Sequence, residues 1–139
     1  LRTKHHHLES VVLNEQSDPL KAVQTPFFDL HAVIEVGTAT EITLDLRGTP
    51  FVIDVKKLKL TSGKATMPMP VRDGRIDFRL FSDHSLVEIF TDNGFKFGAF
   101  PLPPKPDAPI APKLTAKGGE AKIISLDVPE LKSVWPVKK

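Results

Sequence analysis

Histidines near the start of the chain are the first residues whose type and spacing could do chemistry. His5, His6 and His7 are adjacent. Because neighbouring side chains on a strand point to opposite faces, only His5 and His7 could share a metal ion. A terminal stretch of this kind is more often solvated, so we expect no metal site and no cofactor here.

Two further histidines have an acidic neighbour. His31 lies two residues after Asp29, and His84 follows Asp83 directly. Neither has a nucleophile close by in the sequence that would complete a catalytic triad. We therefore assign no catalytic residue to either histidine.

A group of carboxylates occupies the middle of the chain, and Glu88 is its most informative member. Leu86 and Phe90 flank Glu88 on the same side of a predicted strand. A carboxylate between two large apolar side chains could be the raised-pKa acid of a glycosidase, which needs a second carboxylate across a cleft. The alternative, which we favour, is a structural carboxylate bonded to the backbone or to a nearby arginine such as Arg79.

Composition excludes several classes of protein. The 139 residues include 19 basic and 17 acidic side chains with interspersed signs, which is not the footprint of a nucleic-acid-binding protein. No apolar run is long enough to predict a membrane span. The absence of cysteine removes disulfides, thiolate nucleophiles and cysteine metal sites.

The stretch from Ile76 to Pro101 predicts three consecutive antiparallel strands. Apolar and polar residues alternate with a period of two from Ile76 to Phe81, and again from Leu86 to Thr91. The polar segment 82–85 and the segment 92–94 are typical of turns, and Phe95, Phe97 and Ala99 resume the alternation. A meander of this kind buries one face and needs a second sheet to cover it.

The rest of the chain predicts that second sheet. Strands are expected over 8–13, 28–36, 42–46 and 51–55, and the prolines at 68 and 70 limit residues 65–71 to an edge strand or a loop. Residues 101–113 form a proline-rich surface loop, followed by closing strands over 121–126 and 131–135. We predict one all-β domain over residues 1–139, a two-sheet antiparallel β-sandwich of the concanavalin A-like (lectin-like jelly-roll) type.

The segment 83–94, DHSLVEIFTDNG, resembles the motif of the C-terminal β-sandwich of glycoside hydrolase family 32, which comprises invertases, levanases, inulinases and related β-fructosidases. The residues that match the motif are Asp83, Ser85, Val87, Glu88, Phe90 and Gly94. His84 stands where the family usually has Arg, and Leu86 where it has Ser. Leu1-Arg2 and the segment 131–135, ending in Trp135, resemble the two ends of the same domain.

The resemblance implies a catalytic five-bladed β-propeller that this chain does not contain. The propeller carries Asn-Asp-Pro, Arg-Asp-Pro and Glu-Cys motifs. Here Arg72-Asp73 is followed by Gly74, and the chain has neither Asn-Asp-Pro nor cysteine. We therefore expect the chain to be no enzyme on its own, and its parent to hydrolyse β-fructosides.

Two functions follow from the resemblance. In the first, the sandwich is a non-catalytic accessory domain that docks against the propeller and stabilises it, or mediates homo-oligomerisation. In the second, it is a carbohydrate-binding module for levan or inulin. Trp135, Glu88 and Arg79 are the candidates for contact with sugar or with a neighbouring domain, and the family implies an extracellular or periplasmic location.

Within the motif, we expect Asp83 and Ser85 to fix the turn by hydrogen bonds to the backbone. Val87 and Ile89 should fill the core. Gly94 should supply the left-handed backbone of the following hairpin.

Overall fold

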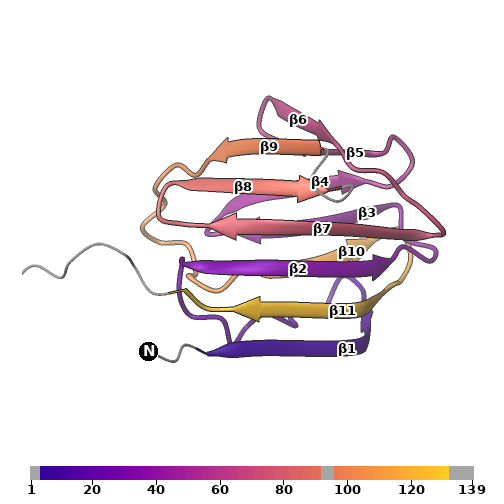
Figure 1. Ribbon diagram of the computed structural model, residues 1–139, viewed down its shortest axis with the longest axis horizontal. Coiled ribbons are helices and arrows are strands. Elements are labelled where there is room, and N and C mark those ends of the chain that lie inside the picture. The colour runs from indigo at the N-terminus through magenta and orange to yellow at the C-terminus, as the bar shows by residue number, and fades with distance from the viewer. Residues whose placement is uncertain (1–3, 92–95, 132–139) are drawn as a thin grey trace, which may run out of the picture.

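The computed structural model of the chain describes residues 4–91 and 96–131, and this part is built from strands alone. Two antiparallel sheets lie face to face, with the six-stranded sheet in front and the five-stranded sheet behind in Figure 1. The predicted two-sheet antiparallel β-sandwich is therefore confirmed. None of the described residues lies in a helix long and apolar enough to cross a bilayer.

The strands of both sheets are short, and they follow one another closely along the chain. They are β1 His5–Leu13, β2 Phe28–Glu35, β3 Glu41–Leu46, β4 Thr49–Asp54, β5 Lys59–Ser62, β6 Ala65–Pro68, β7 Arg75–Ser82, β8 Leu86–Thr91, β9 Lys96–Pro101, β10 Lys113–Lys117 and β11 Ala121–Pro129.

The first sheet has the strand order β1-β11-β2-β7-β8-β9, and the second has the order β10-β3-β4-β5-β6. The meander β7-β8-β9 lies at one side of the first sheet, as the alternating pattern predicts. Pairing of β2 with β7 joins this meander to the strands from both ends of the chain. Residues more than a hundred positions apart in sequence, on β1 and β11, thereby become direct neighbours.

The core lies between the inner faces of the two sheets. Every second residue of β7, namely Ile76, Phe78 and Leu80, is buried there. Phe51 of the second sheet meets Phe100 of the first edge-to-face, with ring centroids 5.4 Å apart. Aromatic pairs of this geometry contribute about 0.5–1.5 kcal/mol beyond the burial of their area. The period-two pattern thus gives the sandwich one continuous apolar interior.

The structure differs from the sequence-based expectation at two strands. β10 was not predicted, because Lys113 was placed in the proline-rich loop and residues 114–117 were assigned to no element, but it forms an edge strand of the second sheet against β3. On β9 the inward aromatic residue is Phe100, whereas Phe97 and Ala99 face outward. Gly98 is compatible with this orientation, whereas a side chain at its position would collide with the Phe100 ring and the Met67 sulfur.

The remaining predicted elements need smaller adjustments. The proline-rich loop occupies residues 102–112, because Pro101 ends β9 and Lys113 begins β10. Pro68 ends β6, which is an edge strand of its sheet. Leu131 lies outside any strand, and the rest of the predicted closing strand, 132–135, falls outside the described residues, as do Gly94 and its hairpin.

Candidate interaction face

The turn between β7 and β8 is fixed by the first residue of the sequence motif. The Asp83 carboxylate oxygen Oδ1 accepts hydrogen bonds from the backbone N–H groups of Ser85 and Leu86, both at 2.9 Å. This is the Asx-turn geometry that aspartate favours. Ser85 contributes through its main chain, since its carbonyl oxygen accepts a hydrogen bond from the Leu102 N–H at 2.8 Å.

An arginine from the opposite sheet holds the same turn. Arg47, in the turn between β3 and β4, donates its guanidinium N–H groups to the carbonyl oxygens of Asp83 at 2.6 Å and His84 at 3.0 Å. Burial lowers the pKa of Arg47, and the nearby Asp83 charge opposes that shift. Sequence reasoning missed Arg47, because its partners lie 36 and 37 positions away. The contact joins the two sheets at one end of the sandwich.

The next residues of the motif divide between the two faces of β8. Val87 and Ile89 are completely buried in the core. Glu88 and Phe90 point the other way, to the outer face of the six-stranded sheet. The motif therefore contributes both to the interior and to an exposed surface.

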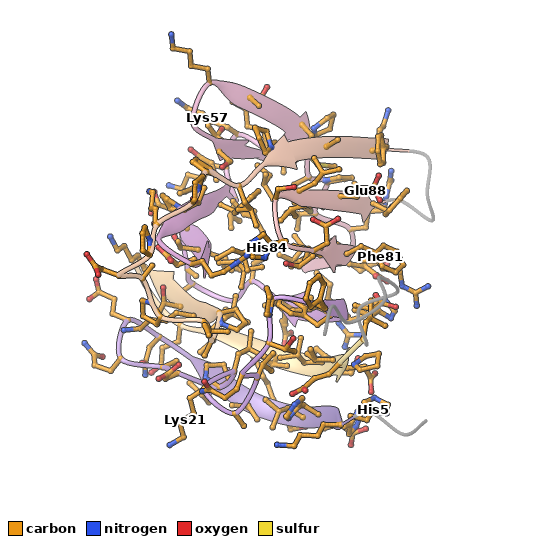
Figure 2. All side chains as sticks on the ribbon, turned by 90° about the vertical axis from the view of Figure 1, so that its left-hand side faces the viewer. His5, Lys21, Lys57, Phe81, His84 and Glu88 are labelled. Atoms are coloured by element: carbon orange, nitrogen blue, oxygen red, sulfur yellow. The ribbon has the colours of Figure 1, made fainter. Side chains whose placement is uncertain are left out.

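Three phenylalanines gather on that outer face, one from each strand of the meander. The rings of Phe81 and Phe90 are 6.1 Å apart, and those of Phe90 and Phe97 are 4.9 Å apart. We call this set the aromatic strip. Phe81 is 37% exposed and Phe97 is 52% exposed, so the strip is open to solvent. Figure 2 shows Phe81 pointing away from the second sheet, on the same side as Glu88.

Glu88 and Arg79 border the aromatic strip. Phe81 is the register partner of Glu88, and Phe90 is the register partner of Arg79, so all four side chains share the outer face. The Glu88 carboxylate forms no ion pair with Arg79 in the described structure, so the predicted contact between these two side chains is absent there. Both charged groups remain at the edge of the aromatic surface.

The other half of the outer face is polar and belongs to β2 and β7. His31 on β2 hydrogen-bonds to the Asp77 carboxylate on β7 at 2.8 Å. Burial raises the pKa of Asp29, although the charges of Arg79 and His31 oppose the shift. One carboxylate oxygen of Asp29 is buried without a hydrogen-bond partner among the described residues. Charged and aromatic groups thus lie side by side on one sheet.

The three adjacent histidines pair with acidic residues at the sheet edge. The Asp127 carboxylate lies 3.2 Å from a ring nitrogen of His5 and 2.6 Å from one of His7. The other ring nitrogen of His7 lies 3.0 Å from Glu9. Hydrogen bonds to Asp127 and Glu9 raise the pKa of His7, and the His7 bond lowers the pKa of Asp127.

His6 points to the opposite side of β1 and pairs with Glu130 at 2.7 Å. His5 and His7 therefore share a face, as their spacing predicts. Within residues 4–91 and 96–131, no three His, Asp or Glu side chains are arranged to hold a metal ion.

A pocket of about 440 Å³ opens at the end of the outer face where β7 begins. Its lining residues are Val33, Glu35, Pro70, Arg72, Asp73, Arg75, Asp77 and Thr91. Sequence reasoning did not find it, because it combines β2, the segment before β7, and residues of β7 and β8. Trp135, a predicted contact residue, lies outside the described residues.

Comparison with known proteins gives one family match. The family model described as glycosyl hydrolases family 32 C terminal matches residues 1–129. Among curated proteins, a fructan beta-fructosidase of Streptococcus mutans serotype c is 28% identical over 109 residues, which are 74% of this chain and 8% of that protein.

Solved structures share the fold at low sequence identity. An exo-inulinase from Aspergillus awamori superposes with a TM-score of 0.71 at 16% identity, over 95% of this chain and 29% of that one. The Caenorhabditis elegans galectin LEC-6 superposes with a TM-score of 0.57 at 13% identity, over 92% of this chain and 94% of the galectin. The chain therefore spans less than a third of the exo-inulinase and a smaller share of the curated relative.

Proposed function

Because the chain belongs to the family of glycosyl hydrolase family 32 C-terminal domains, we propose that it is the non-catalytic accessory sandwich of a β-fructosidase. In this proposal it docks against the catalytic propeller of the longer polypeptide and stabilises it. The resemblance of the motif 83–94 implies such a propeller. The chain covers 29% of the exo-inulinase, which leaves room in that enzyme for a larger domain. The proposed location is extracellular or periplasmic.

The observation that carries the docking proposal is the aromatic strip. Three contacting phenylalanines on an outer face form an exposed apolar patch, and such patches commonly mark interaction sites. Aromatic side chains are enriched at protein interfaces. Leu86, a further exposed apolar residue, lies on the same outer face of β8. We therefore assign the propeller as the occupant of this surface.

The charged groups around the aromatic strip fit the same role. Interfaces commonly have an apolar centre and a polar rim. Glu88 and Arg79 stand at the border of the strip and could form ion pairs with a partner. Charges at a rim contribute to orientation and specificity more than to affinity.

The test compares one substitution in two contexts. Phe97→Asp should lower the thermal midpoint of the longer polypeptide markedly, because an interface position of this kind contributes about 2 kcal/mol or more. The same substitution should change the isolated 139-residue chain much less. Ile110→Asp is the matched control, because Ile110 is 49% exposed but lies in the proline-rich loop.

Equal effects of Phe97→Asp in both contexts would contradict docking through this surface. A concentration-dependent dimer of the isolated chain that Phe97→Asp dissociates, with no effect in the longer polypeptide, would instead assign the strip to a second copy of the chain.

Fructan binding is the second candidate function. The pocket at the start of β7 favours it, because it brings carboxylates and guanidinium groups together in a concave site.

A further inference from the structure

The pocket beside the start of β7 lies on the outer face but is separate from the aromatic strip. Val33 and Pro70 contribute apolar surface to it, and none of its described lining residues is aromatic. Its volume of about 440 Å³ falls within the range of roughly 300–1,000 Å³ that is usual for small-molecule sites. It is therefore large enough to accept a ligand rather than a single water molecule.

The wall of the pocket is held in place by a tight hairpin. The N–H of Arg72 donates to the carbonyl oxygen of Arg75 at 2.8 Å, and the reverse bond measures 2.9 Å. Between them, Asp73 and Gly74 have φ angles of 53° and 74°, the left-handed conformation of a two-residue hairpin turn. A bond from the Val36 N–H to the Gly74 carbonyl oxygen at 2.9 Å ties this turn to the end of β2.

A second pair of contacts holds Asp77, another residue that lines the pocket. His31 holds the Asp77 carboxylate at 2.8 Å. The Thr91 hydroxyl donates to the Asp77 carbonyl oxygen at 2.9 Å. The Asp77 carboxylate is therefore positioned before any ligand arrives, which reduces the ordering cost of its contact with a ligand.

The charges that line the pocket are of both signs. Glu35 and Arg75 are register partners on β2 and β7, yet they form no ion pair with each other in the described structure. Three carboxylates and two guanidinium groups line the same cavity. Neither sign dominates enough to select a phosphate or a metal cation.

This combination suits a neutral ligand with many hydroxyl groups. A carboxylate accepts hydrogen bonds from two neighbouring hydroxyls, and a guanidinium donates to their oxygens. Such charge-assisted bonds are roughly twice as strong as neutral ones. The apolar surfaces of Val33 and Pro70 can contact the carbon skeleton between the hydroxyls.

We propose that this pocket binds a neutral oligosaccharide through Glu35, Asp77 and Arg75, and that the ligand is a β-fructan. The fructan class rests on the proposed function, because that is the substrate of the enzyme family to which the domain belongs. The pocket would hold polymer near the enzyme, and it takes no part in hydrolysis.

Affinity electrophoresis of the 139-residue chain in gels containing levan, inulin, dextran or no polysaccharide tests the proposal. We expect retardation in a fructan gel and none in dextran. Glu35→Gln and Arg75→Gln should each weaken the interaction at least about tenfold, since each removes a charge-assisted contact. Arg79→Gln is the matched control, because it alters the same outer side of β7 but lies outside the pocket.

Three results would overturn the proposal. They are unchanged mobility of the wild-type chain in both fructan gels, equal retardation in dextran, and loss of binding in Arg79→Gln with retention in the two pocket variants. Thermal midpoints of all variants show whether they are folded. The docking proposal is tested by a different measurement, the thermal midpoint of Phe97→Asp in the longer polypeptide. Its failure would not change the electrophoresis result.

Discussion

The outer faces of the two sheets carry different kinds of side chain, although both faces belong to the surface of one sandwich. One row of register partners across the five-stranded sheet reads Thr115, Thr43, Val52, Thr61 and Thr66. One row across the six-stranded sheet reads His7, Asp127, His31, Arg79, Phe90 and Phe97. β-Branched residues with hydroxyl groups pack well on a pleated surface and remain compatible with water. The first row is thus sufficient for a solvated face.

The second row contains more than a solvated face requires. Its aromatic end is open to solvent, and its polar end consists of histidine–carboxylate pairs. Since both sheets share one core, the difference does not arise from the demands of folding. The difference supports our proposal that the six-stranded sheet is the face that contacts another molecule.

The largest predicted loss of stability comes from the buried side of the meander, and a much smaller one comes from its outer side. Ile89→Ala should cost about 2–5 kcal/mol of unfolding free energy, because it leaves a cavity in the core. Phe97→Ala should cost about 1 kcal/mol in the isolated chain, because it loses mainly its contact with Phe90. Urea unfolding followed by circular dichroism measures both, and similar costs would mean that the aromatic strip serves the fold.

The turn that joins the two sheets should show an intermediate effect. Asp83→Ala removes two hydrogen bonds to backbone N–H groups and should cost about 1–2 kcal/mol. Asp83→Asn keeps an acceptor oxygen at the same position and should recover at least half of that loss. The same urea titration decides, and equal losses in the two variants would show that the two bonds contribute little.

The polar end of the six-stranded face should make stability depend on pH. The raised pKa of His7 implies a contribution that is complete below about pH 6.5, the usual histidine value, and lost as pH rises through the folded pKa. The lowered pKa of Asp127 implies a contribution that is lost only as pH falls through its folded pKa. Both contributions are therefore present in mildly acidic solution.

Thermal midpoints of the wild-type chain and His7→Gln, measured from pH 5 to pH 9, test this dependence. The difference between them should be largest near pH 6 and shrink toward pH 9. His84→Gln is the control. His84 lies in the turn between β7 and β8, where its ring stacks on Phe27 rather than pairing with Asp127 or Glu9. A difference that stays constant with pH would show that the titration of His7 does not contribute to the stability of the chain.

The smallest effect is expected on the five-stranded face. Val52→Thr completes the row of threonines and should change the unfolding free energy by no more than about 0.5 kcal/mol, as is usual for surface positions. Urea unfolding checks it. A loss above 1 kcal/mol would show that this face, too, depends on specific packing.

Much of the fold follows from alternation along single strands. The pattern from Ile76 to Thr91 determines which side chains of β7 and β8 are inside, because one face must be buried. β10 could not be found this way, since it has only five residues and directly follows a run of prolines. On β9, the absence of a side chain at Gly98 leaves space for the Phe100 ring and the Met67 side chain, and no local pattern encodes this fit.

The candidate site was less accessible to sequence reasoning. Alternation along β7 and β8 places Arg79 and Glu88 on the outward side of these strands, and their contact with sugar or with another domain stays a prediction. The pocket was missed because it needs the pairing of β2 with β7, which brings Glu35 beside Arg75. His7 and Asp127 are separated by 120 positions and meet only through the pairing of the first and last described strands.

The most direct test of the central claim is cysteine labelling. The chain has no cysteine, so each introduced thiol is unique within the domain. Ala99→Cys places one beside the aromatic strip, and Thr66→Cys places one on the five-stranded face. Labelling rates with a maleimide reagent are measured by mass spectrometry in the isolated chain and in the longer polypeptide that the proposed function implies.

We expect the thiol at position 99 to react at least about tenfold more slowly in the longer polypeptide, because an interface excludes the reagent from its centre. The thiol at position 66 should react at the same rate in both. Equal rates at position 99 in the two contexts would contradict docking through the six-stranded face.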